Sequence, residues 1–323
     1  MKTSARALAF AAAGIILVAA SLSVGARVIT PDAIARMLFE GARGIDYAVL
    51  VHIRLPRVIC AMLVGASLAV SGTAFQAVLK NPLADPYLIG VSGGAALGAT
   101  AAIIAGAPTY VVAAASFAGS LAAVAAVYFL SRRMMFGSTA LILSGVALGF
   151  ILSSGVLMTY ALVRSDQVHR ALMWLMGDLG IARYDALGAA GAASLIIAAG
   201  MWYYRRHLDV ISLGDHFSRA LGVTARDLGM IFWMASLLAA ISVSLAGVIG
   251  FVGLIVPHAA RNIFGPRHSR LLPSAAAAGA LFLLASDTVG RILASPYEVP
   301  AGIITSLLGG VFFLVLMARR GGG

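Results

Sequence analysis

The sequence predicts an all-α polytopic membrane protein that crosses the bilayer with about ten helices. Three observations predict this fold class. Of the 323 residues, 61% are hydrophobic and 11% are charged, whereas soluble domains are roughly 45–50% apolar and about 25% charged. The mean hydropathy is +0.98, and the 36 glycines fit membrane helices, where glycine is common. A soluble chain of this size would need more charged residues to cover its surface.

Ten apolar stretches are each about the length that a spanning helix needs, which is about 20 residues. One long apolar run, 230–264, is divided by Gly247, Gly250 and Gly253, and we expect the chain to reverse near Gly247. The first stretch follows two basic residues, as in a signal peptide, but it is too long for one, so we expect it to remain as a span. The predicted spans are 7–26, 57–79, 87–106, 109–131, 139–162, 186–204, 230–247, 248–264, 273–293 and 300–318.

The basic residues predict the orientation, because cytoplasmic loops are enriched in lysine and arginine. Ten spans that start from a cytoplasmic N-terminus place 14 of the 23 basic residues inside and keep the basic C-terminus inside as well. Nine or eleven spans would move that terminus to the opposite side. The 14 residues predicted inside are Lys2, Arg6, Lys80, Arg132, Arg133, Arg205, Arg206, Arg219, Arg226, Arg261, Arg267, Arg270, Arg319 and Arg320.

An internal similarity suggests repeated halves within a single transmembrane domain, residues 1–323. A proline follows ten residues after a glycine in two apolar segments, Gly72 to Pro82 and Gly247 to Pro257. Repeated halves are common in transporters, which often place the translocation path at their interface. The halves would be about 57–162 and about 230–318, although chance similarity between glycine-rich segments remains the alternative.

Several kinds of site have no signature in the sequence. There is no phosphate-binding loop of the G-x-x-x-x-G-K-[ST] type, because no Gly-Lys pair occurs. The one cysteine, Cys60, excludes an internal disulfide, and the six histidines do not have metal-ligand spacing. The basic residues are spread thinly between apolar runs, which is not typical of a nucleic-acid-binding face. We therefore expect no cofactor, no metal and no nucleic acid.

Ionisable residues within the spans are few, and they limit the alternatives. Asp287 and Arg291 are four residues apart on one predicted helix, so they share a helix face and could pair. We find no convincing set of buried carboxylates, which argues against an ion-coupled secondary transporter and against a membrane enzyme with paired acids. The ion-coupled secondary transporter is the main alternative function.

The longest predicted cytoplasmic loop, about 205–229, has an amphipathic pattern. Leu213, Phe217 and Leu221 recur at intervals of four and predict one apolar helix face. Gly222 has the place of a residue that ends a helix, and the segment from Thr224 to Asp227 resembles a capping box. We expect two short helices joined by a glycine turn, which serve either as a docking element for a cytoplasmic partner or as a packed surface loop.

Two further segments lie at predicted span ends. Lys80–Gly94 contains Pro82 and Pro86, which favour the end of one helix and the start of the next. The pair Arg54 and Arg57 lies at the predicted outer mouth of the second span, where it would either anchor the helix or bind acidic groups of a partner. Residues 166–176 predict a short helix on the same outer side.

Four motifs in order resemble the FecCD family, the permease subunits of type II ABC importers for iron–siderophore, haem and cobalamin. The likeness extends over nearly the whole chain. Its motifs are Arg54-Leu-Pro-Arg57, the residues Ser71-Gly72…Gln76…Asn81-Pro82-Leu83-Ala84-Asp85-Pro86…Gly90-Val91-Ser92-Gly93, the loop Leu213-Gly214…Ala220-Leu221-Gly222, and Gly250-Phe251-Val252-Gly253-Leu254-Ile255-Val256-Pro257-His258.

The resemblance implies a non-catalytic permease subunit in the bacterial inner membrane, with both termini cytoplasmic. It implies a homodimer with a translocation path on the dimer axis, lined by the span 139–162, two ATPase subunits below and a periplasmic binding protein above. Coupling to the ATPase would involve Leu213, Gly214, Phe217, Arg219, Ala220, Leu221 and Gly222. Docking of the binding protein would involve Arg54, Arg57 and Arg291. The residues that narrow the cytoplasmic end of the path would be Asn81, Leu83, Ser138 and Thr139.

Overall fold

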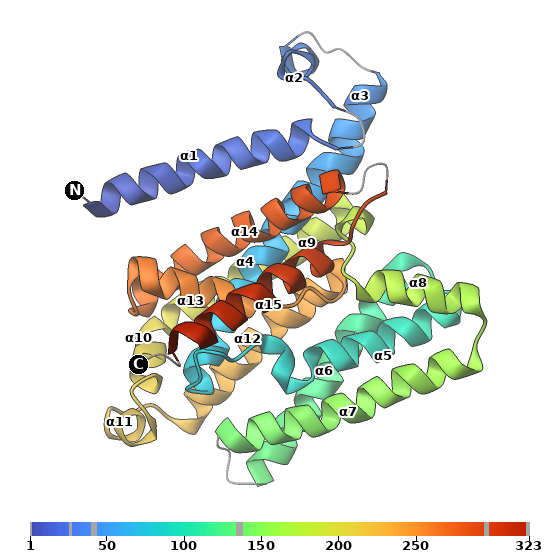
Figure 1. Ribbon diagram of the computed structural model, residues 1–323. Coiled ribbons are helices and arrows are strands. Elements are labelled where there is room, and N and C mark those ends of the chain that lie inside the picture. The colour runs from blue at the N-terminus through green and yellow to red at the C-terminus, as the bar shows by residue number, and fades with distance from the viewer. Residues whose placement is uncertain (1, 26–27, 40–43, 134–137, 294–296, 321–323) are drawn as a thin grey trace.

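The computed structural model describes residues 2–25, 28–39, 44–133, 138–293 and 297–320, and every regular element in these ranges is a helix (Figure 1). The α-helices are α1 (Lys2–Ser23), α2 (Pro31–Phe39), α3 (Ile45–Ala48), α4 (Leu55–Val78), α5 (Val91–Ile104), α6 (Thr109–Arg133), α7 (Ser138–Leu162), α8 (Ser165–Leu175), α9 (Tyr184–Tyr203), α10 (Arg205–Ile211), α11 (Asp215–Ala220), α12 (Ala225–Ala246), α13 (Val252–Phe264), α14 (His268–Leu293) and α15 (Ala301–Arg320). The π-helix η1 (Val49–Arg54) joins α3 to α4, and η2 (Pro86–Ile89) and η3 (Leu179–Ile181) are 3-10 turns.

The ten predicted spans correspond to ten apolar helices. Seven helical segments of the described chain are long and apolar enough to cross a membrane, and the first of them, Ile45–Val78, comprises α3, η1 and α4. The other three spans correspond to α1, whose apolar part is shorter than a full span, and to the short helices α5 and α13. The predicted fold class is therefore confirmed, with α1 apolar from Phe10 to Ser23 and the end of the predicted first span, residue 26, outside the described residues.

Several predicted span boundaries were wrong. The seventh and ninth spans begin at Ala225 and His268 rather than at residues 230 and 273. The second span begins at Ile45 rather than at residue 57, because the polar residues His52 and Arg54 lie inside one continuous helical segment. The third begins at Val91 rather than at residue 87, because Gly90 has a left-handed φ of +86° that separates η2 from α5. The eighth begins at Val252 rather than at residue 248.

Helix α4 lies at the centre of the bundle and packs against α12, α13 and α14. Glycines allow these close contacts, as is common where membrane helices meet. A Cβ atom added to Gly65 would lie 2.2 Å from the carbonyl oxygen of Gly279 on α14. A Cβ added to Gly72 would lie 1.9 Å from the carbonyl oxygen of Gly253 on α13. The backbones of α4, α13 and α14 therefore touch directly.

Helices α5, α6 and α7 form a second group beside this core, and α1 lies on the opposite flank (Figure 1). Gly94 of α5 and Gly119 of α6 face each other, and a Cβ on either would lie 2.2 Å from the other's carbonyl oxygen. The main contacts of α7 are with α5, α6 and η2, and the side chains on another side of α7 are exposed.

The predicted reversal near Gly247 is a break between α12 and α13. Helix α12 ends at Ala246, Gly247 has a φ of +70°, and Phe251 has a left-handed φ of +67° before α13 begins. Backbone groups freed within a membrane need partners inside the protein. The backbone N–H of Ile249 donates to the hydroxyl of Tyr87, 3.2 Å away, which ties the break to η2.

The two segments of the predicted repeat differ locally. Gly72 lies inside α4 and Pro82 in the loop that follows, whereas Gly247 lies in the break and Pro257 inside α13. The short helices α5 and α13 nevertheless have similar places in the order of elements along the chain, because each follows a long helix and an irregular segment.

The bundle has two ends, which we name by their short helices. The α11 end holds α10 and α11 and the ends of α1 and α15 nearest the termini, and the α8 end holds α2, α3 and α8 (Figure 1). Helix α1 runs between them, because Phe10 packs on Phe264 while Ser21 contacts Arg291.

Candidate functional site

The predicted inner loop folds as α10 and α11 and presents an apolar surface. Leu213, Phe217 and Leu221 are 63%, 61% and 62% exposed. Their spacing of four residues predicted that they share one apolar helix face. Large apolar side chains that gather on a surface outside the spans mark an interaction site. We name these three residues the α11 surface.

Glycine turns bound the α11 surface. Gly214 (φ +112°) directly precedes α11, and Gly222 (φ +84°) follows it, in the place predicted for a helix-ending glycine. The predicted capping box is present, since the hydroxyl of Thr224 accepts the N–H of Asp227 and the Asp227 carboxylate accepts the N–H of Thr224. This box begins α12 itself, and the second short helix is instead α10, on the other side of Gly214. The remaining predicted coupling residues, Arg219 and Ala220, are exposed.

The α11 surface has a rigid support. Leu208 and Ile211 of α10 are buried in the main core, and the buried hydroxyl of Ser218 donates to the Gly214 carbonyl at 2.8 Å. Asp209 of α10 accepts the backbone N–H of His268 at 2.8 Å, and its carboxylate lies 2.7 Å from the imidazole Nδ1. Helix α10 is therefore fixed to α4 and α14, and α11 packs on α10, without the help of the exposed side chains of the α11 surface.

The predicted gate residues Asn81 and Leu83 lie in the loop that follows α4 at the same end. The Asn81 side chain accepts the backbone N–H of Leu83 at 2.9 Å, and both residues are half-buried. Asp85 accepts the N–H of Tyr87 at 2.8 Å, and burial raises the pKa of its carboxyl to about 6. Lys80, which precedes the gate residues, has a left-handed φ of +49°.

The other two predicted gate residues begin α7. Ser138 is half-buried and Thr139 is exposed. Ser138 and Lys80 line one small cavity of about 30 Å³, so the structure brings the start of α7 next to the loop of Asn81. Further along α7 the uncovered side carries the exposed apolar residues Leu143, Val146, Phe150, Ile151, Leu157, Met158 and Leu162, together with the exposed Ser153 and Ser154.

The three arginines predicted to dock a partner lie together at the α8 end, but they are buried. Arg57, Arg291 and Asp287 are 7%, 4% and 1% exposed. The Arg57 Nη2 lies 2.9 Å from Asp287 Oδ1, and the Arg291 Nε lies 3.2 Å from Asp287 Oδ2. The pair of Asp287 and Arg291 confirms the prediction from their spacing. We name Arg57, Asp287 and Arg291 the buried triad.

Neighbouring groups complete this cluster. Arg291 Nη2 donates to the hydroxyl of Ser21 at 2.6 Å, and Arg54 Nη1 donates to the carbonyls of Leu22 and Ser23. Arg57 Nη1 donates to Glu298 Oε2 at 2.5 Å, and Glu298 is 46% exposed. The cluster therefore joins α1, α4, α14 and the segment before α15.

The sequence did not predict Arg57's partners. Arg57 and Asp287 are 230 residues apart, and no local spacing relates them. The only available signal was that a carboxylate inside an apolar span needs a cation, and Arg291 already met that need.

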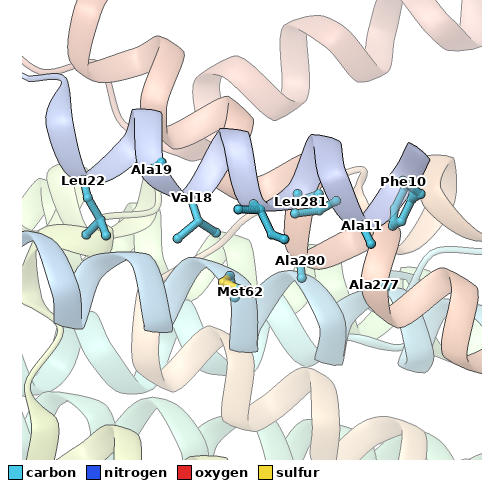
Figure 2. A pocket seen from close by; sticks show the side chains of 11 residues that line it. Phe10, Ala11, Val18, Ala19, Leu22, Met62, Ala277, Ala280 and Leu281 are labelled. Carbon is cyan, nitrogen blue, oxygen red and sulfur yellow. The ribbon is translucent and has the colours of Figure 1, made fainter. Parts of the chain in front are cut away.

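Two larger grooves lie on the sides of the bundle. One, of about 610 Å³, lies between α1, α4 and α14, and its eleven lining residues are all apolar (Figure 2). The other, of about 830 Å³, lies between α6, α9 and α12 near the α8 end and includes Arg183 and Asp185. Within the described ranges, no three His, Cys, Asp or Glu side chains are grouped so that they could hold a metal ion.

Known proteins resemble the chain over most of its length. The cobalamin import system permease protein BtuC of Halobacterium salinarum is 43% identical over 274 residues, which cover 83% of this chain and 73% of the relative. The Fe(3+)-citrate import system permease protein YfmE of Bacillus subtilis is 37% identical over 310 residues, which cover 94% and 91%. The hemin transport system permease protein HmuU of Yersinia pestis is 38% identical over 276 residues, which cover 83% of each.

A solved structure shares the fold. The chain superimposes on a metal-chelate type ABC transporter in an inward-facing conformation with a TM-score of 0.86 and 29% identity. The match covers 97% of this chain and 98% of that one. The family model of the FecCD transport family matches residues 13–319. Because this family model and these relatives match most of its length, the chain belongs to the FecCD transport family.

Proposed function

We propose that this chain is the permease subunit of a binding-protein-dependent ABC importer that passes an iron chelate or cobalamin through the bacterial inner membrane. Relatives named for ferric citrate, haemin and cobalamin import support this substrate class. The observation that carries the proposal is the exposed α11 surface at one end of a membrane bundle. The chain would form a homodimer, with two ATPase subunits at the α11 end and a periplasmic binding protein at the α8 end.

The proposed orientation places the α11 end in the cytoplasm. Basic residues concentrate there, as expected for cytoplasmic loops. The helices that carry the two termini also end there, so both termini would be cytoplasmic. The basic residues of this end with described positions include Lys80, Arg132, Arg205, Arg206, Arg219, Arg226, Arg261, Arg267 and Arg270.

The α11 surface would receive the ATPase. Replacing Phe217 with glutamate puts a charge at the centre of the apolar face, so we expect at least a tenfold loss of ATPase that co-purifies with the chain. Phe217 is 61% exposed, so the fold should persist in detergent. Co-purification and size-exclusion chromatography measure the two effects.

Tyr297 provides a matched control for this experiment. It is an aromatic residue that is 81% exposed at the α8 end. Tyr297→Glu should leave ATPase binding unchanged. Normal ATPase binding by Phe217→Glu would contradict the assignment of the α11 surface.

The path would run along the homodimer axis beside α7. The uncovered apolar side of α7 supports this placement, because an apolar helix side of this kind faces either lipid or a second subunit. Asn81, Leu83, Ser138 and Thr139 would narrow the cytoplasmic end. A path with few charges suits large substrates that must bind weakly and leave again.

Docking of the binding protein at Arg54, Arg57 and Arg291 needs an exchange of partners. Contacts within the chain fill the buried side of the cluster, and the partly exposed carboxylate that contacts Arg57 is that of Glu298. An incoming carboxylate would therefore displace Glu298 and leave Asp287 in place. Bidentate contact with a carboxylate is what a guanidinium favours.

Glu298→Gln tests this exchange. The substitution removes the competing charge, so we expect the cognate binding protein to bind several-fold more tightly in surface plasmon resonance. Asp32→Asn is the control, because Asp32 is an exposed acid at the same end that pairs only with Arg36 among the contacts of the described chain. Unchanged affinity for Glu298→Gln would argue that the arginines serve the fold alone.

The alternative of an ion-coupled secondary transporter gains no support from the buried carboxylate. Asp287 is held by Arg57 and Arg291, and a carboxylate fixed between two cations is a poor carrier of protons or sodium ions. Substrate uptake in proteoliposomes that requires ATP and not an ion gradient would decide between the two functions.

A further inference from the structure

One ion pair connects the α11 surface to the predicted gate loop. The ammonium group of Lys80 contacts the carboxylate of Asp215, across 135 residues of sequence. Asp215 is the first residue of α11 and lies between Leu213 and Phe217 of the α11 surface. Lys80 directly precedes the gate residue Asn81.

The backbone on the Lys80 side is firmly fixed. The N–H of Lys80 donates to the Ala77 carbonyl and the N–H of Asn81 to the Gln76 carbonyl, both at 3.1 Å. Asn81 in turn holds the N–H of Leu83. A force on the Lys80 side chain therefore acts on a short, hydrogen-bonded segment that contains both gate residues.

The pair also adjoins the second gate segment. Lys80, Asp215 and Ser138 line the small cavity described above, whose other walls come from α4, α7, α10, α11 and α12. The start of α11 therefore lies beside both predicted gate segments.

Stability does not account for the position of this pair. Ion pairs that are open to solvent contribute little to folding; Asp215 is 68% exposed and Lys80 is 24% exposed. Helix α10 is already held by Leu208, Ile211 and the contact of Asp209 with His268, and α11 packs on α10. The pair adds a directional link between α11 and the gate loop.

We propose that the Lys80–Asp215 ion pair transmits displacement of α11 to the gate loop, with Lys80 as a positioning residue for Asn81 and Leu83. The inference rests on the proposed function, because it assumes that an ATPase moves α11. Through such a link, the free-energy difference between the open and the closed gate loop would depend on the conformational state of the ATPase. Coupling between two sites requires a dependence of this kind.

Thiol labelling at the gate can test the link. The one native cysteine, Cys60, is fully buried, so Leu83→Cys would supply the reactive thiol in the full chain bound to its ATPase in nanodiscs. The probe is a membrane-impermeant maleimide, and the measured quantity is the ratio of labelling rates with and without Mg-ATP. With the native pair we expect ATP to change the rate at least fivefold.

Charge reversal at either partner should uncouple the gate. In the Leu83→Cys background, Lys80→Glu or Asp215→Lys should reduce the ATP effect to less than twofold while ATPase binding continues. The double exchange Lys80→Glu/Asp215→Lys restores opposite charges and should recover at least half of the effect. That recovery separates a specific pair from general damage to the fold.

A matched control lies at the opposite end. Arg164 and Asp166 form an exposed pair, and Asp166 lies in the first turn of α8 as Asp215 does in α11. Arg164→Glu should leave the ATP effect unchanged. A full ATP effect in Lys80→Glu and Asp215→Lys would overturn the link, and so would a double exchange that recovers nothing. No ATP effect with the native pair would instead contradict the proposed function.

Discussion

Replacing Asp287 with leucine is expected to lower the free energy of unfolding by about 3–5 kcal/mol, the typical effect of removing one partner from a buried ion pair. The substitution leaves Arg57 and Arg291 without their shared carboxylate, and both are almost fully buried. Thermal unfolding of the purified protein in detergent, with SDS titration as a second method, would measure the change.

Replacement of the whole buried triad should cost far less. In the variant Arg57→Met/Asp287→Leu/Arg291→Met, all three charges of the buried triad are removed together, and similar replacements are often neutral or stabilising. Glu298 loses its contact with Arg57, but its side chain is 46% exposed and stays in contact with solvent. Glu298→Gln should change stability by only about 0–1 kcal/mol, because its partner contact is exposed on one side. A triple variant as unstable as the single one would show that the ion pairs themselves, rather than unpaired charge, determine stability.

The triad also separates folding from docking. If the arginines bind the partner protein, the triple variant should regain stability but not docking, which would be measured with the cognate binding protein. Recovery of both would show that the cluster only holds α1, α4 and α14 together.

Long apolar runs made the helices predictable, because a spanning segment must satisfy its own backbone whatever its neighbours are. Local patterns were also informative at α11, where three apolar residues four apart predicted the exposed face. The Thr224 capping box correctly marked the start of a helix, but that helix is the long α12 rather than the predicted second short helix. The pairing of Asp287 with Arg291 was also accessible from the local sequence, because two residues four apart on a helix lie on the same face.

The features that the sequence did not reveal depend on contacts between distant segments. The start of α13 depends on Phe251, which has a left-handed backbone conformation and whose ring packs against Gly309. Similarly, Lys80 and Asp215 meet only because α10 and α11 fold back beneath α4. The arginine motif at 54–57 was placed at the mouth of a span because the apolar run begins there, although the helix continues outward through η1.

Gly72→Ala is expected to have the second large effect, a loss of roughly 3 kcal/mol in the free energy of unfolding, at the upper end of what overpacking usually costs. The added Cβ would lie 1.9 Å from the carbonyl oxygen of Gly253, and no side chain there can rotate away. Helices α4 and α13 would have to separate. Because Gly253 in turn lies against Pro86 of η2, the movement would reach the segment that follows the gate loop.

Gly188→Ala is the matched control, and its expected effect has the opposite sign. Gly188 lies in α9, and an added Cβ meets no atom within 4 Å. Alanine favours a helix over glycine by about 1 kcal/mol, so this variant should be as stable as the parent or slightly more stable. Both variants add the same methyl group to a helical glycine, so any difference between their unfolding midpoints in detergent reports the contact alone. Equal midpoints would contradict the direct backbone contact between α4 and α13, and with it the explanation of how glycine brings the break at 247–251 close to the centre of the bundle.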